Sequence, residues 1–253
     1  MTARFTGKTV LVTGSGRGIG RGIALAFARE GASVVVAGRT RAPIEETARL
    51  IGQGGGTATA VTADVTDSAS VASLISTTVA TYGSLDVAVN NAGVLTTRGP
   101  LADIDEQQWR SMLDINVTGV LLSMKHEVAH MRANGGGSIV NISSTLGWHV
   151  RHAGVAGYAA TKAAVTALTR TAALDHMGEG VRINTVSPGP VATPMSLLPG
   201  ESGTDRADRL KETSPVGRVG AVEEIAAAVL HLAAPESAYT VGADLAVDGG
   251  VSA

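Results

Sequence analysis

The sequence contains no cysteine, which excludes a disulfide framework, a thiolate metal site and a thiol nucleophile. It carries a formal net charge of only −2 and no block of basic residues, which argues against binding to nucleic acid or to an anionic membrane. No run of about 18 apolar residues occurs and no apolar leader opens the chain, so we expect a cytoplasmic protein without a membrane span.

Short β-branched runs alternate with alanine-rich segments of helical period along the chain. Near-continuous apolar strands that alternate with helices predict a parallel sheet covered on both faces. We therefore expect one α/β domain over residues 1–253, a doubly wound, Rossmann-type sheet of seven strands. The expected strands are 8–13, 33–38, 57–63, 85–90, 137–143, 181–187 and 243–247, and helices are expected near 18–30, 41–52, 68–81, 103–133, 156–177 and 222–233.

A glycine-rich turn separates the first expected strand from the first helix and reads T-G-x-x-x-G-x-G from Thr13 to Gly20. Glycines let the backbone turn tightly and approach a pyrophosphate, whose charge then lies at the helix N-terminus. The spacing differs from G-x-G-x-x-G, and a purely structural turn is the alternative. We predict a phosphate-binding turn with contacts from Gly14, Ser15, Arg17, Gly18, Ile19 and Gly20.

The second expected strand ends in Gly38-Arg39-Thr40, with no acidic residue before Glu45. An acidic residue here would bind the ribose hydroxyls of NAD, whereas an arginine can meet the 2′-phosphate of NADP. Arg39 and Thr40, with Arg17 in the glycine turn, therefore favour NADP(H) over NAD(H). The alternative is that both arginines are solvated surface charges.

Tyr158 and Lys162 lie four residues apart at the start of an expected helix, so their side chains project from one face. A nearby cation stabilises a phenolate, which predicts a pKa for Tyr158 lowered from about 10 toward neutrality. Such a tyrosine can act as an acid or a base at about pH 7. Taken alone, the spacing is common and fits an ordinary surface pair equally well.

Further motifs follow in order along the chain. N-N-A-G (Asn90 to Gly93) closes the fourth expected strand, Ser143-Ser144 closes the fifth, P-G follows the sixth and V-D-G-G the last. With the glycine turn and Y-x-x-x-K, this ordered set resembles the short-chain dehydrogenase/reductase family over essentially the whole chain. The resemblance implies hydride transfer between a nicotinamide cofactor and a small carbonyl or alcohol substrate, in a homotetramer.

The resemblance also implies functional residues. It implies a catalytic tetrad of Asn116, Ser144, Tyr158 and Lys162, with Thr145 as the alternative hydroxyl because many members place the serine one position nearer to the tyrosine. Asp64 and Val65 are implied at the adenine, Asn90 near the ribose, Lys162 at the nicotinamide ribose, and Val191 with Thr193 at the nicotinamide amide. The other implied cofactor contacts are Asn91, Ala92, Gly93, Tyr158, Pro188 and Gly189.

Residues His126 to His130 read H-E-x-x-H, the pattern of zinc proteases, with both histidines on one face of a helix. Zinc hydrolysis also requires a third ligand and an open metal position in a cleft. In the implied fold, this helix packs outside the sheet and away from the strand ends. We therefore expect a partly exposed helix and no metal site.

The substrate pocket is expected between residues 94–99, 145–155 and the irregular, proline-rich loop 188–220, which we predict to bind substrate. Its expected contacts are Ser144, Leu95, Leu146, Trp148, His152 and Met195, with Arg98 and Arg151 nearby. This mixture suits a mostly apolar ketone or secondary alcohol. The alternatives are an NAD-dependent alcohol or steroid-like dehydrogenase, a 3-oxoacyl-thioester reductase, and a cofactor-sensing protein without activity.

Overall fold

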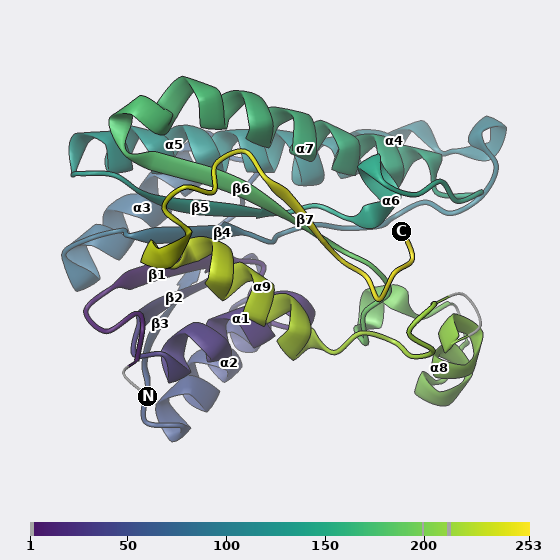
Figure 1. Ribbon diagram of the computed structural model, residues 1–253, viewed down its shortest axis with the longest axis horizontal. Coiled ribbons are helices and arrows are strands. Elements are labelled where there is room, and N and C mark those ends of the chain that lie inside the picture. The colour runs from purple at the N-terminus through teal and green to yellow at the C-terminus, as the bar shows by residue number, and fades with distance from the viewer. Residues whose placement is uncertain (1–2, 199, 212–213) are drawn as a thin grey trace.

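A computed structural model describes residues 3–198, 200–211 and 214–253. In it, seven strands form one sheet of order β3-β2-β1-β4-β5-β6-β7 (Figure 1), and every neighbouring pair is parallel. This confirms the predicted fold class. The strands are β1 (Thr9–Thr13), β2 (Ser33–Gly38), β3 (Thr57–Thr62), β4 (Val87–Asn90), β5 (Gly137–Ile142), β6 (Val181–Pro188) and β7 (Asp244–Val247).

Helices cover both faces of the sheet (Figure 1). One face carries α1 (Gly18–Arg29), α2 (Arg41–Gln53) and α9 (Val222–Ala233), and the other carries α3 (Ser68–Tyr82), α5 (Gly119–Ala133) and α7 (Ala156–His176). Successive strand residues point to opposite faces of the sheet. Val10 and Val12 pack in the core formed with α1 and α9, and Leu11 packs in the core formed with α3 and α5. Burial on both faces explains why the strands are continuously apolar.

The helix expected over 103–133 is divided into pieces. A 3₁₀ turn, η1 (Leu101–Asp103), precedes α4 (Glu106–Leu113), and a π-helical turn, η2 (Asp114–Thr118), separates α4 from α5. Asn116 lies in the π-helical turn, where its side chain donates to the Val94 carbonyl at 2.9 Å and accepts from the Val94 amide at 2.8 Å. The widened turn thus directs a buried amide toward the strand ends. Such turns are frequent at functional sites.

The segment 188–220 is not irregular, as the sequence suggested, because it contains η4 (Pro194–Ser196) and α8 (Gly203–Lys211). Helix α8 buries only Leu210, so its sequence shows no apolar period from which it could be predicted. It stands away from the sheet, beyond the carboxyl ends of the strands (Figure 1). Three further short elements are α6 (Thr145–Trp148), η3 (Met177–Glu179) and η5 (Pro235–Ser237).

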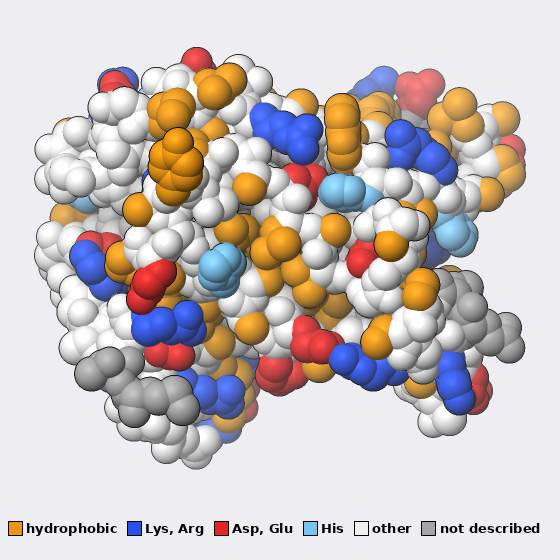
Figure 2. Space-filling view, in the orientation of Figure 1, with side chains coloured by type: hydrophobic (Ala, Val, Ile, Leu, Met, Phe, Trp, Pro, Cys, Tyr) orange, Lys and Arg blue, Asp and Glu red, His pale blue; other side chains and the backbone are white. Residues whose placement is uncertain are grey.

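The surface agrees with the low net charge. Cationic and anionic side chains are interspersed on the face shown in Figure 2. Of the helices in the described residues, none has the length and apolar character that crossing a membrane requires.

A buried polar layer joins β4, β5, α5 and α7 behind the strand ends. The Asn90 amide donates to Glu127 Oε2 and to Asn141 Oδ1, both at 2.9 Å, and the Asn141 amide donates to Thr169 Oγ1 at 2.8 Å. Glu127 is fully buried, and its Oε1 has no hydrogen-bond partner among the described residues. Burial raises the pKa of Glu127 to about 7, although the Asn90 hydrogen bond opposes the shift. Glu127 is therefore a carboxyl group that holds its proton close to neutrality.

This burial makes the free energy of unfolding depend on pH. Because the folded-state pKa is raised, the wild type loses stability as pH rises from about 4.5 through about 7, and Glu127→Gln lacks that loss. We expect the unfolding free energy of Glu127→Gln relative to wild type to increase by up to about 3 kcal/mol between about pH 4 and pH 8. Urea denaturation at both pH values measures it, and Glu236→Gln, at an exposed position, is the control. A pH-independent difference would contradict the raised pKa, because it would mean that Glu127 has the same pKa in the folded and unfolded states.

Candidate active site

A cavity of about 510 Å³ lies along the carboxyl ends of β1, β2, β3 and β4, the edge at which open parallel sheets bind ligands. Most of the predicted cofactor contacts line it. These are Gly14, Arg17, Gly18, Ile19, Arg39, Asp64, Val65, Asn91, Ala92, Gly93 and Thr193. Thr13, Gly38, Val94, Thr96, Ile115 and Pro194 also line the cavity but were not among the predicted contacts.

The glycine turn and N-N-A-G are held together by contacts that leave no room for side chains. Gly14 has a φ of +64°, and a Cβ atom there would lie 2.8 Å from the Cα atom of Ala92. The Asn91 amide donates to the carbonyls of Thr13 and Gly14, while Thr13 Oγ1 accepts from the backbone amides of Asn91 and Ala92. Two motifs far apart in sequence thus form one rigid wall at the start of α1.

The charges along the cavity fit a nicotinamide dinucleotide. Gly18 and Ile19, at the N-terminus of α1, line the cavity, so backbone amides there can meet a pyrophosphate. Arg17 and Arg39 also line it, and no carboxylate among the described residues forms an ion pair with either. Hydrogen bonds from Thr66 and the charge of Arg39 hold the pKa of Asp64 below its usual value. The donor set suits the phosphate groups of a dinucleotide.

Other predicted cofactor residues do not line the cavity. Asn90 directs its side chain into the buried polar layer, because successive side chains at the end of a strand point to opposite faces and Asn91 takes the cavity side. Ser15 is buried and donates to backbone carbonyls, and Gly20 packs behind the glycine turn against Asn91. Thr40, Tyr158, Lys162, Pro188, Gly189 and Val191 are also absent from the cavity lining.

The four residues of the predicted tetrad converge beside this cavity. Tyr158 and Lys162 project from α7, and the Lys162 ammonium donates to the Ile142 carbonyl at 2.9 Å and lies 5.8 Å from the centre of the Tyr158 ring. A Cβ atom on Gly93 would lie 3.3 Å from Asn116 Oδ1 and 3.4 Å from Lys162 Nζ. N-N-A-G therefore packs directly against both groups.

The structure distinguishes the two candidate hydroxyls. Ser144 caps α6, accepting from the Leu146 amide at 3.2 Å, and its side chain lies close enough to the Tyr158 phenol to lower the pKa of that group. Thr145 turns the other way and donates to the Pro188 carbonyl at 3.3 Å. Ser144 therefore lies beside Tyr158, whereas Thr145 hydrogen-bonds the last residue of β6.

The expected direction of the tyrosine pKa shift is wrong. Burial raises the pKa of Tyr158 to about 12, against lowering effects from the Ser144 hydrogen bond and the Arg98 charge. Lys162 contacts the Ile142 carbonyl rather than the phenol oxygen, and burial lowers its pKa to about 8. Near neutrality, Tyr158 is therefore a protonated phenol, beside a lysine that can gain or lose a proton.

The predicted substrate contacts divide into two groups. Leu95 and Met195 line the cavity, and Leu146 packs with Leu95, Met112 and Val155 around Tyr158. Trp148 lies on the outer surface, where Arg170 stacks on its ring at 5.3 Å. His152 is exposed and bonds to the neighbouring Ala153 carbonyl. Neither Trp148 nor His152 lines the cavity.

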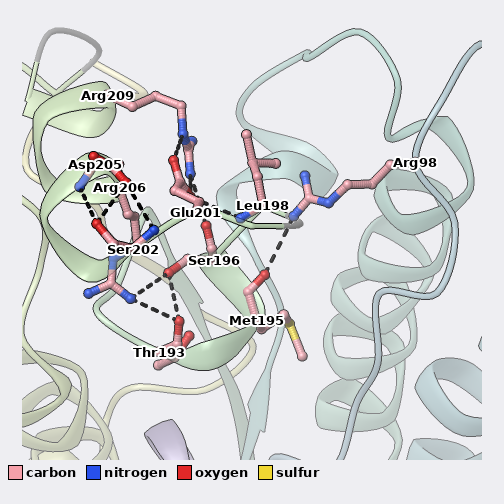
Figure 3. A network of polar contacts seen from close by, with 10 residues as sticks. All are labelled: Arg98, Thr193, Met195, Ser196, Leu198, Glu201, Ser202, Asp205, Arg206 and Arg209. Carbon is pink, nitrogen blue, oxygen red and sulfur yellow. Dashed lines mark hydrogen bonds and ion pairs between the residues drawn. The ribbon is translucent and has the colours of Figure 1, made fainter.

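Helix α8 fastens the segment that borders the substrate end of the cavity (Figure 3). Arg206 donates to the Thr193 carbonyl at 3.1 Å, and Arg209 donates to the Ser196 carbonyl at 3.0 Å while pairing with Glu201 at 2.6 Å. From the opposite side, Arg98 reaches the Met195 carbonyl at 3.4 Å. Three arginines thus hold this segment through its backbone.

The H-E-x-x-H motif does not assemble a metal site in the described residues. Glu127 points into the core, whereas His126 lies toward α3, where its Nε2 is 2.9 Å from Ser68 Oγ. His130 lies beside Asn134 at the end of α5. The carboxyl group and the two imidazoles therefore face different sides of the helix.

Comparison with known proteins agrees with this geometry. A family model described as "Enoyl-(Acyl carrier protein) reductase" matches residues 14–252. The chain is 41% identical over its full length to the full-length cis-4-hydroxycyclohexanecarboxylate dehydrogenase of Sinomonas cyclohexanicum. It is 35% identical to cyclohexanol dehydrogenase of Acinetobacter sp. strain SE19, covering 98% of this chain and 96% of that one. A solved short-chain dehydrogenase/reductase from Serratia marcescens BCRC 10948 has a TM-score of 0.90 at 37% identity, covering 99% of this chain and 100% of that one.

A seven-stranded parallel sheet with cofactor and tyrosine motifs at its carboxyl edge, matched over nearly the whole chain by these relatives, defines the class. This chain belongs to the short-chain dehydrogenase/reductase family. It is an oxidoreductase acting on CH–OH groups, and its family uses NAD(P) cofactors.

Gly147 controls how closely α6 approaches α7, and so where Ser144 lies relative to Tyr158. A Cβ atom there would lie 2.8 Å from the backbone of Lys162 and Ala163. We expect Gly147→Ala to displace α6 and lower kcat about 10- to 100-fold, because sub-ångström misplacement weakens a catalytic constellation. Gly52→Ala, on α2 with open space around it, should retain wild-type kcat. Equal turnover in wild type and folded Gly147→Ala would contradict this positioning role.

Proposed function

We propose that this enzyme is an NADP(H)-dependent carbonyl reductase that interconverts a mostly apolar ketone and its secondary alcohol. The observation that carries the proposal is the convergence of Ser144, Tyr158, Lys162 and Asn116 beside a cavity lined by Arg17 and Arg39. We also propose a cytoplasmic homotetramer. The exposed Leu121 on α5 and Leu174 on α7 support contacts between subunits through these helices.

In the proposed mechanism, the carbonyl oxygen of the substrate accepts hydrogen bonds from the Ser144 hydroxyl and the Tyr158 phenol. The nicotinamide cofactor, when bound, supplies the hydride. Negative charge then develops on the substrate oxygen, and Tyr158 donates its proton to that oxygen. The Tyr158 phenol carries its proton at neutral pH, as this role requires, whereas the burial that raises its pKa makes it a weaker acid.

Lys162 and Asn116 are assigned to the return of a proton to Tyr158. The pKa of Lys162, about 8, lets its ammonium exchange a proton near neutrality, and its position above the Tyr158 ring suits return of a proton to the phenolate. Asn116 lies within contact distance of Gly93, as Lys162 does, and is held by Val94 and Thr161. We assign it the positioning of a water that exchanges protons with Lys162.

The chemistry of the substrate follows from the walls near Tyr158. Leu95, Leu146 and Val155 offer apolar contact, and Met195 adds a flexible side chain at the cavity edge. Two relatives are named for cyclohexane-ring alcohols. An alicyclic ketone or secondary alcohol of that size is therefore the proposed substrate class.

Tyr158→Phe tests the proposed acid. Removing the hydroxyl should lower kcat for ketone reduction by about 10²- to 10⁴-fold, the usual worth of a general acid, while NADPH still binds. Turnover is followed at 340 nm and NADPH binding by fluorescence titration. Tyr82→Phe, which removes a phenol bonded to Thr59 away from the cavity, is the matched control. Normal turnover in Tyr158→Phe would refute the mechanism.

Arg39→Asp tests the cofactor preference. The change removes the proposed partner of the 2′-phosphate and places a carboxylate where ribose hydroxyls would lie. The ratio of kcat/KM for NADPH to that for NADH should fall about 10- to 100-fold, the worth of a charge-assisted hydrogen bond. Arg41→Asp alters an exposed arginine paired with Glu45 and absent from the cavity lining, so it should leave the ratio unchanged. An unchanged ratio in Arg39→Asp would contradict a role for Arg39 in cofactor preference.

A further inference from the structure

Arg98 is an exposed residue beside the segments that carry Leu95 and Met195, both of which line the cavity. It follows N-N-A-G on the segment that carries Leu95, and its side chain extends across to the segment of Met195 and Leu198 (Figure 3). There its Nη2 donates to the Met195 carbonyl at 3.4 Å, a long hydrogen bond. The guanidinium therefore bridges the segment of Leu95 and the segment of Met195.

This guanidinium has hydrogen-bonding capacity to spare. A guanidinium offers five N–H donors in a planar fork. The contact with Met195 is the one hydrogen bond found for the Arg98 side chain in the described residues, and no carboxylate there forms an ion pair with it. Arg209, by contrast, is neutralised by Glu201. Arg98 thus presents a cation without an ion-pair partner beside the segments of Leu95 and Met195, two apolar residues that line the cavity.

The charge of Arg98 also affects the pKa of the Tyr158 phenol. Arg98 is the one cation whose charge lowers the pKa of the Tyr158 phenol, although Lys162 is the nearer neighbour in sequence. Leu95, which packs beside Tyr158, lines the cavity together with Met195, whose carbonyl Arg98 contacts. Leu146 also packs beside Tyr158, so apolar side chains adjoin both groups.

We propose that Arg98 binds a carboxylate carried by the substrate, so that the enzyme prefers an alicyclic oxo acid or hydroxy acid to the corresponding neutral ketone or alcohol. This inference rests on the proposed function and adds the second anchor of the substrate. The ketone oxygen lies at Tyr158 and Ser144, the ring contacts the apolar walls, and the carboxylate receives the Arg98 fork. A planar carboxylate matches the two parallel N–H groups of a guanidinium. One anchor at each end fixes which face of the ring is presented to the cofactor.

A structural role for Arg98 predicts a different outcome. If Arg98 only latches the Met195 segment, its loss would affect acidic and neutral substrates alike. A matched pair of substrates separates the two roles: 4-oxocyclohexanecarboxylate and its methyl ester differ in charge while sharing the ring and the ketone.

The test measures kcat/KM for both substrates with NADPH in wild type, Arg98→Gln and Arg98→Lys. We expect wild type to prefer the acid. Arg98→Gln should lose about 10- to 100-fold on the acid, the worth of a hydrogen-bonded charge pair, and little on the ester. Arg98→Lys, which keeps the charge without the fork, should fall between the two. Arg151→Gln changes an exposed arginine bonded to the Trp148 and Val150 carbonyls and should keep the wild-type ratio.

A binding measurement keeps this inference separate from the proposed reaction. Calorimetry with cyclohexanecarboxylate in the presence of NADPH should show about 10- to 100-fold weaker binding to Arg98→Gln than to wild type. Absence of turnover with every ketone would overturn the proposed function. The calorimetric titration needs no turnover, so it would still test whether Arg98 binds a carboxylate. Equal losses on acid and ester, or equal binding of cyclohexanecarboxylate to wild type and Arg98→Gln, would overturn carboxylate recognition.

Discussion

The contact between the end of β4 and the glycine turn is the constraint on which the rest of the site depends. The Asn91 amide and the Thr13 hydroxyl tie the two strand ends together, and the absence of a side chain at Gly14 lets the backbones meet. Gly93, two residues farther on, extends the same wall to Lys162 and Asn116. Cofactor cradle and proton-handling groups are therefore parts of one packed unit, and neither can shift without the other.

Burial shifts the pKa values of Tyr158 and Lys162 more strongly than hydrogen bonds and neighbouring charges do. Tyr158 and Lys162 are both withdrawn from water, which favours the neutral form of each and moves their pKa values in opposite directions. A protonated phenol beside a lysine that titrates near neutrality suits proton donation to a developing alkoxide. The Arg98 charge and the Ser144 hydrogen bond both lower the pKa of Tyr158 and so offset part of the effect of burial.

Much of this architecture is predictable because it depends on local patterns. The seven strands follow from apolar runs buried on both faces, and the tetrad follows from motifs whose order matches a family. Other features depend on three-dimensional surroundings. The pKa of Tyr158 reflects burial that a helical spacing does not report. Asn90 and Asn91 are identical in type, and only the strand geometry assigns one to the core and the other to the cavity. Helix α8 is too polar to show an apolar period.

The central claim is that this site transfers hydride to a ketone carbon while Tyr158 protonates the oxygen. The most direct test is a single-turnover reduction of cyclohexanone by NADPH deuterated at the transferable position of the nicotinamide, with the product analysed by mass spectrometry. The account predicts cyclohexanol with one deuterium on the carbinol carbon. Unlabelled cyclohexanol from both C4-deuterated epimers of NADPH, or consumption of NADPH without alcohol formation, would contradict it.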